Sequence, residues 1–223
     1  MIIMKSPLLI TLCGILISAC TITHKGFDAQ AHRGGRGLIP ENTIASDENA
    51  INYNCTIEMD LQMSQDKKIV VSHDAYISPI FCLTPEGDTM SIKDRYGRLI
   101  YNMTYDSVAK YDCGSKLYPD FPQQKKMYAI KPLLSALIDS VEAYGKKKYY
   151  LPHYNIEINS NLDWDGKYYP SLPEYIDSAM AIIIRKGIVK QIMIQSFDVR
   201  ALRIIHKKWP KVETSYLVGV DNK

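Results

Sequence analysis

The sequence lacks several features that mark other classes of protein. Its N-terminal apolar run, residues 7–17, is too short to span a bilayer as a stable anchor. No basic stretch is interleaved with aromatic residues and the formal net charge is only +3, so nucleic-acid binding is not indicated. No short repeat or low-complexity run is visible. With 223 residues, 46% of them apolar, the chain can bury one core, and we expect one domain.

The N-terminus instead predicts a targeting segment. Lys5 precedes the apolar run, and the run ends in Leu-Ile-Ser-Ala-Cys, which resembles a bacterial lipobox. We therefore expect a lipoprotein signal peptide over residues 1–19, a lipid anchor on Cys20 and a tether over 20–27. The protein would then be a membrane-anchored lipoprotein of a bacterial cell envelope, facing the periplasm or the exterior. The alternative is an ordinary secretory signal with a chance cysteine.

Cysteine is scarce as well. Outside the predicted signal and its lipobox, three cysteines remain: Cys55, Cys82 and Cys113. An odd number allows at most one disulfide, and the pair to consider is Cys82–Cys113. The pattern does not favour that bridge over three free thiols.

Strand-like and helix-like segments alternate along the chain. Strands are predicted at 28–33, 56–63, 69–73, 154–158, 191–196 and 213–218. Helices are predicted at about 43–53, from 133, at 171–186 and at 199–209. This alternation predicts a parallel α/β sheet.

Residues 75–131 interrupt this alternation. They are rich in Pro, Gly, Asp and Tyr and show no long periodic helix, only a possible short one near 105–110. We interpret them as an insertion. A loop of this length in a compact domain is usually a lid or a binding loop.

Ionisable side chains lie within or at the ends of the first three predicted strands. Glu58 and Asp60 are two residues apart, so on a strand they face the same side. Two carboxylates on one covered face repel each other unless a cation lies between them. His32 and His73 close two other apolar runs. Two histidines that flank a carboxylate-bound metal suit acid–base chemistry on a phosphate ester.

Several motifs in order resemble the glycerophosphodiester phosphodiesterase family. They are His32-Arg33-Gly34, Pro40-Glu41-Asn42-Thr43, Glu58-x-Asp60, His73-Asp74, Asn155-Ile156-Glu157-Ile158 and Gln195-Ser196-Phe197-Asp198. The resemblance covers about residues 29–218. It implies a phosphodiesterase-type TIM barrel with its site at the C-terminal ends of the strands.

The resemblance also implies roles for single residues. One divalent cation, Ca²⁺ or Mg²⁺, would be held by three hard oxygen ligands: Glu58, Asp60 and Glu157. His32 and His73 would be the general acid–base pair, and Arg33 would bind a phosphate oxygen while Glu41 orients it. Asp74 is interpreted as structural or supporting, and Trp164 as a substrate contact or a packing residue.

Two departures from the family pattern stand out. Asn159 occupies a position where the family usually has a lysine. The sequence also ends five residues after the last predicted strand, whereas the family continues for about two more βα units. We therefore expect an incomplete barrel over residues 28–223, with about six of eight βα units and open, aggregation-prone edges.

The implied activity is metal-dependent hydrolysis of a small-molecule glycerophosphodiester to glycerol 3-phosphate and an alcohol. One alternative is phospholipase-D-like action on lysolipid head groups at the membrane. Another is a truncated, non-catalytic relic, or a fragment whose missing strands come from a partner. The sequence does not indicate an oligomeric state.

Overall fold

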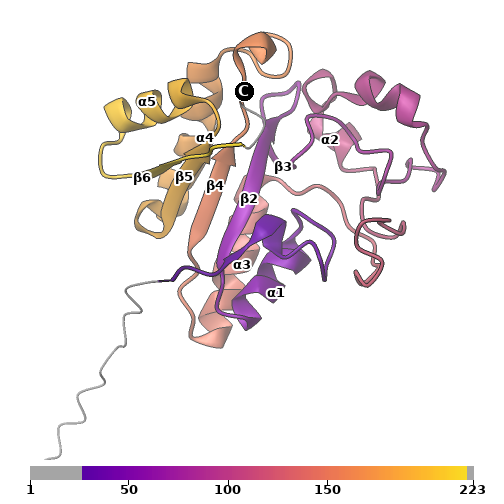
Figure 1. Cartoon of the computed structure of the whole chain (residues 1–223), viewed down its shortest axis with the longest axis horizontal. Helices are drawn as coiled ribbons and strands as arrows, with labels where there is room; N and C mark the ends of the chain where they lie inside the picture. The colour runs from indigo at the N-terminus through magenta and orange to yellow at the C-terminus, as the bar shows by residue number, and fades with distance from the viewer. Residues whose placement is uncertain (1–26, 220–223) are drawn as a thin grey trace, which may run out of the picture.

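The computed structural model describes residues 27–219, which form an open sheet backed by helices (Figure 1). Five parallel strands lie side by side in the order β1 (Gln30–Ala31), β2 (Thr56–Met63), β4 (Tyr154–Ile158), β5 (Ile192–Ser196) and β6 (Glu213–Tyr216). In this register Asp60 lies opposite Glu157, and Glu157 lies opposite Gln195. Within the described residues β1 and β6 are the two edges of this parallel row. The predicted open α/β sheet is confirmed.

The third strand differs from its prediction. β3 (Ile69–Val71) pairs with β2 in the antiparallel direction, with Leu61 opposite Val71, so the expectation of a parallel strand was wrong. The reason is the short connection over 64–68, since a parallel neighbour needs a crossover of a dozen or more residues. The antiparallel direction brings the chain back to the middle of β2, where the amide of Ser72 donates to the carbonyl of Asp60 at 2.9 Å.

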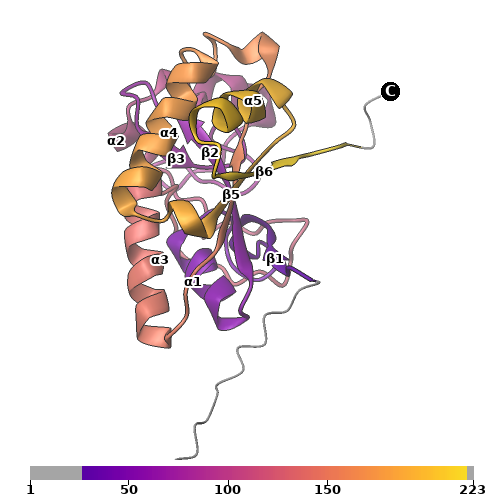
Figure 2. The ribbon, with the colours of Figure 1, turned by 90° about the vertical axis from the view of Figure 1, so that its left-hand side faces the viewer.

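Helices cover one face of the sheet. They are α1 (Ile44–Asn52), α3 (Leu134–Lys148), α4 (Leu172–Lys186) and α5 (Val199–Lys208). Figure 2 shows α3 and α4 stacked along one side of the strands. The Thr43 side chain caps α1, and Ser171 caps α4, which ends at Gly187 in the left-handed conformation. Alternate residues of β2 and β4, such as Met59 and Ile156, are fully buried beneath these helices.

The insertion segment, residues 75–131, contains little regular structure, as predicted. Its elements are the 3-10 helices η2 (Ile92–Arg98) and η3 (Ile100–Asn102) and the short helix α2 (Tyr105–Val108). It builds a small core of its own around Ile77, Phe81 and Ile100.

A disulfide joins Cys82 to Cys113, although the sequence pattern did not favour one. The chain folds back on itself there, because the amide of Leu83 donates to the carbonyl of Asp112 at 2.7 Å. This pairing leaves the two cysteine Cα atoms 3.9 Å apart. Cys55 stays a free thiol.

Two expectations concern residues near the N-terminus. The signal peptide over 1–19, the lipid on Cys20 and most of the tether lie outside the described residues. Among residues 27–219, no helix combines the length and the apolar character that crossing a membrane requires.

Candidate active site

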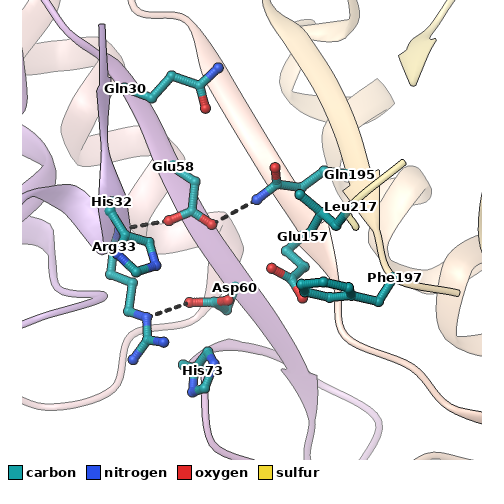
Figure 3. A pocket seen from close by; sticks show the side chains of 10 residues that line it. All are labelled: Gln30, His32, Arg33, Glu58, Asp60, His73, Glu157, Gln195, Phe197 and Leu217. Carbon is teal, nitrogen blue, oxygen red and sulfur yellow. Dashed lines mark hydrogen bonds and ion pairs between the residues drawn. The ribbon is translucent and has the colours of Figure 1, made fainter. Parts of the chain in front are cut away.

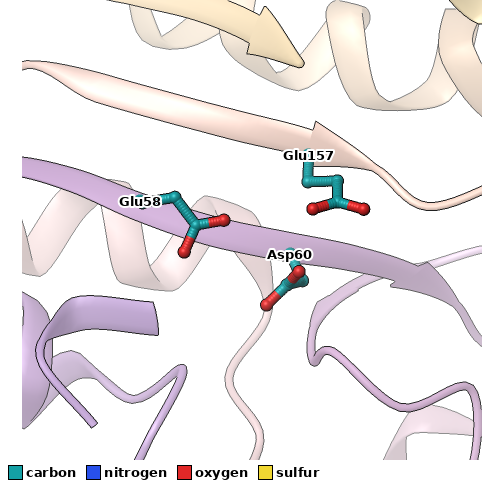
Figure 4. Close-up of side chains that lie close together, drawn as sticks. All are labelled: Glu58, Asp60 and Glu157. Atoms are coloured by element: carbon teal, nitrogen blue, oxygen red, sulfur yellow. The ribbon is translucent and has the colours of Figure 1, made fainter. Parts of the chain in front are cut away.

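Three carboxylates converge on the face of the sheet that the helices leave free. Glu58 and Asp60 project from β2 and Glu157 projects from β4, because alternate residues of a strand share a face. Each offers an oxygen within 4.8 Å of those of the other two. Figure 4 shows the three side chains side by side on the two strands. The structure therefore brings the three predicted ligands together.

These carboxyl groups are buried and close together, which disfavours their ionised forms. Burial and the neighbouring charge of Asp60 raise the pKa of Glu58 to about 8. The same two causes raise the pKa of Glu157 to about 7. A divalent cation would reverse this penalty, and three clustered carboxylates are the hard oxygen donors that Ca²⁺ and Mg²⁺ require. The donor set therefore fits one such ion.

The chain leaves β1 through a tight turn rather than a continued strand. The strand predicted over 28–33 ends at Ala31, and His32–Gly34 form the 3-10 helix η1. Arg33 takes the left-handed conformation with φ 54°. This geometry lets its backbone amide donate to Oε2 of Glu58 at 2.7 Å. A Cβ on the next residue, Gly34, would lie 2.2 Å from an oxygen of Asp47, so only glycine fits at this position.

Polar residues of the following loop hold Arg33 and Asp60 in place. The guanidinium of Arg33 forms an ion pair with Glu41 at 3.0 Å, which is the expected contact, and its Nε lies 3.6 Å from Asp60. Asn42 donates from Nδ2 to Asp60 Oδ2 at 2.9 Å and accepts from the Asp60 amide at 3.2 Å.

Gln195, from β5, holds the remaining carboxylate of β2, because it donates to Oε1 of Glu58 at 2.9 Å. These buried contacts fix the carboxylates before any ligand arrives.

Both predicted histidines reach the same cavity, which has a volume of about 420 Å³. Figure 3 shows His32, from η1, and His73, after β3, beside Asp60. Nδ1 of His73 lies 2.9 Å from Oδ1 of Asp74. The backbone carbonyl of His73 accepts from the side-chain Nδ2 of Asn159 at 3.1 Å. Asn159, where a lysine was expected, therefore holds the backbone of one histidine.

The two histidines have opposite electrostatic environments. Burial, followed by the positive charges of Arg33 and Arg36, lowers the pKa of His32 below its usual 6.5. Burial alone would lower the pKa of His73 too, but the hydrogen bond to Asp74 and the charge of Asp60 outweigh it and raise that pKa. The shifts are opposite in direction: the surroundings favour the neutral imidazole at His32 and the protonated imidazole at His73, as a general base and a general acid require.

The model of the glycerophosphoryl diester phosphodiesterase family matches residues 32–223, nearly all of the described part of the chain. The chain belongs to this family. Two curated members named glycerophosphodiester phosphodiesterase are each 28% identical to it. The one from Bacillus subtilis aligns over 192 residues and the one from Caldanaerobacter subterraneus over 188. Each alignment covers 84% of this chain but only 58% and 65% of the respective relative.

Solved structures show that the fold is shared across the family. A chain from Silicibacter pomeroyi superposes with a TM-score of 0.76 at 24% identity, covering 86% of this chain and 64% of its own length. A phosphodiesterase from Oleispira antarctica, solved with the product sn-glycerol-3-phosphate, gives a TM-score of 0.64 at 24% identity. It matches 86% of this chain and 66% of its own length.

Lys131 is a buried residue beside this site for which the sequence analysis predicted no role. It is 4% exposed, and its Nζ donates to Oγ of Ser72 at 2.8 Å. Ser72 in turn donates to the carbonyl of Asp74 at 2.8 Å. Burial lowers the pKa of Lys131. The available signal was a single cation between Ile130 and Pro132, directly before an apolar helix.

Proposed function

We propose that this protein hydrolyses glycerophosphodiesters to glycerol 3-phosphate and an alcohol, with His32 as general base and His73 as general acid. The observation that carries the proposal is that two histidines and a cluster of three carboxylates line one cavity, and the opposite directions of the two histidine pKa shifts agree with it. General acid–base catalysis needs one partner that can accept a proton and one that can donate it at the working pH. Membership of the family supports the substrate class.

Each group has a place in this reaction. Glu58, Asp60 and Glu157 would hold one divalent cation, Ca²⁺ or Mg²⁺, which would offset the negative charge of the phosphate oxygens. Arg33 lines the cavity beside them, and its guanidinium would donate to a further phosphate oxygen.

Proton transfer follows from the same geometry. Neutral His32 would take the proton of the attacking oxygen, which belongs either to water or to a neighbouring glycerol hydroxyl of the substrate. Attack by the hydroxyl would form a cyclic glycerophosphate, which water would then open to glycerol 3-phosphate. Protonated His73 would give its proton to the leaving alkoxide. The hydrogen bond from His73 Nδ1 to Asp74 stabilises the protonated form and leaves Nε2 as the donating atom.

The binding partner would be a small molecule. The cavity of about 420 Å³ lies in the range of ordinary ligand pockets. The Oleispira antarctica phosphodiesterase with the same fold holds sn-glycerol-3-phosphate, which supports a glycerophosphodiester here.

We also propose that the protein is exported to the cell envelope and is anchored there by a lipid on Cys20. The Cys82–Cys113 disulfide supports export, because such bonds persist in oxidising compartments and are rare in the cytosol. A Cys20→Ser variant should become soluble or remain unprocessed. Membrane retention of a correctly processed Cys20→Ser chain would contradict the anchor.

A release assay tests the proposed reaction. Purified protein is incubated with several glycerophosphodiesters and with Ca²⁺, Mg²⁺ or EDTA, and glycerol 3-phosphate is measured. We expect release that depends on the cation and disappears in Glu157→Gln, whereas Glu213→Gln, an exposed glutamate of β6, retains it. No release from any diester with either cation would refute the proposal.

A further inference from the structure

A second cavity of about 340 Å³ adjoins the first and shares His73, Glu157 and Phe197 with it. Its walls are aromatic, and we call it the aromatic annexe. Five rings line it: Tyr76, Tyr96, Trp164, Tyr168 and Phe197. The function proposed above uses none of these rings.

The rings come from three separate segments and are held by mutual packing. Tyr76 and Tyr96 belong to the insertion segment and pack edge to face, with centroids 5.9 Å apart. Trp164 and Tyr168 lie in the loop after β4, with centroids 5.2 Å apart. Phe197 follows β5 and is 52% exposed. The annexe thus has two preformed aromatic walls, and one of them comes from the insertion segment.

The charges around the annexe favour a cation. Asp74 lines it as a carboxylate outside the proposed metal site, and neither a lysine nor an arginine is among the described residues that do so. The hydrogen bond and charge of His73 help to lower the pKa of Asp74 despite its burial, so this carboxylate is ionised at neutral pH. Arg95 lies over the ring of Tyr96, 4.6 Å from its centroid, which is a cation–π contact within this wall.

We propose that the aromatic annexe binds the alcohol part of the substrate and selects alcohols that carry a quaternary ammonium group. Aromatic rings with a nearby carboxylate recognise such a group through the negative faces of the rings. His73 lies on the boundary of the two cavities, so an alcohol seated in the annexe presents its oxygen to the proposed acid. This inference rests on the proposed function and deepens it.

A matched pair of substrates isolates the contribution of the ammonium charge to kcat/KM. Glycerophosphocholine and its 3,3-dimethylbutyl ester analogue have the same shape, but the analogue replaces the ammonium nitrogen with carbon. We expect kcat/KM to favour glycerophosphocholine by about 2- to 30-fold, the range that cation–π contacts supply. Equal kcat/KM for the two esters would overturn the proposal.

Variants that lack one aromatic ring test whether the annexe causes the preference for the charged ester. Trp164→Leu should bring the ratio of the two kcat/KM values close to one. Tyr96 is 56% exposed, so Tyr96→Leu spares the core and should reduce the ratio even where Trp164→Leu fails to fold. Tyr128→Leu is the control, because this 66% exposed tyrosine lines a different hollow. A ratio that stays unchanged in both annexe variants would also overturn the proposal.

A binding measurement separates this inference from the proposed reaction. The sequence has two tryptophans, so Trp209→Phe leaves Trp164 as the only one. Choline should change the fluorescence of this protein saturably, 3,3-dimethylbutan-1-ol should not, and Tyr168→Leu should abolish the response. Choline binding without hydrolysis of any diester would refute the reaction but keep the annexe. Hydrolysis without a choline response would refute the annexe alone.

Discussion

The two faces of β2 and β4 are equally buried but have opposite chemistry. On the helix-covered face, Met59 and Ile156 are 0% exposed and pack in the main core. On the other face, Asp60 and Glu157 are 1% and 8% exposed. Burial of the apolar face stabilises the fold, whereas burial of the acidic face destabilises it unless protons or a cation compensate. The comparison shows that one pair of strands both stabilises the domain, through its apolar face, and carries the destabilising acidic groups of the site, on its other face.

The largest effect should come from the histidines on the acidic face. His32→Ala and His73→Ala should each lower turnover by about 10²- to 10⁴-fold, because each removes one proton-transfer group. Circular dichroism and melting should show both variants folded. His206→Ala, an exposed histidine of α5, is the control and should keep full activity. Near-full activity in His32→Ala or His73→Ala would remove that residue from the mechanism.

A substitution on the covered face should have the reverse pattern. Ile156→Ala leaves a cavity beneath the helices and should lower the free energy of unfolding by about 2–5 kcal/mol. Its turnover per folded molecule should change little, since the side chain points away from the carboxylates. Chemical denaturation and a rate corrected for the folded fraction measure both quantities. A large loss of turnover at unchanged stability would contradict the assignment of stability to the covered face and of catalysis to the acidic face.

The pH dependence of stability should report the acidic face directly. The folded-state pKa of Glu58, about 8, lies above the ordinary value of 4.5, as does that of Glu157, about 7. Their stabilising contribution is therefore complete below about pH 4.5 and is lost as the pH rises to about 8. In EDTA the protein should melt several degrees lower at pH 8 than at pH 5.

Two comparisons sharpen that measurement. Excess Mg²⁺ or Ca²⁺ should restore part of the melting temperature at pH 8, because a cation takes the place of the protons. Glu58→Gln should flatten the pH trend, and Glu213→Gln should leave it intact. A melting temperature in EDTA that rises from pH 5 to pH 8 would contradict the assigned direction of these shifts.

The smallest expected effect concerns the partner of one histidine. As the acid, His73 must be protonated, so its pKa sets the basic limb of the pH–rate profile. Asp74→Asn removes a charge that raises this pKa, and the basic limb should move to lower pH. The acidic limb, set by His32, should stay in place. A shift of the acidic limb instead would indicate that His73 is the general base and His32 the general acid.

Much of the fold and the site could be predicted because the signals were local. The alternation in Thr56–Met63 and Tyr154–Ile158 defines β2 and β4 to the residue, and it placed Glu58, Asp60 and Glu157 on one face. The direction of β3 was missed, although its five-residue connection excludes a parallel crossover. The disulfide depends on how the insertion segment folds back, which no local pattern reports.

The conformation of Arg33 has a consequence for attempts to improve this protein in the laboratory. A non-glycine residue at φ 54° is disfavoured by about 1–2 kcal/mol, a penalty that glycine escapes. Arg33→Gly would relieve this strain and keep the amide that faces Glu58, but it would leave the buried Glu41 without its closest ion-pair partner, which costs about 3–5 kcal/mol. Selection for heat resistance and selection for turnover would therefore both retain arginine at this position, although its backbone is strained.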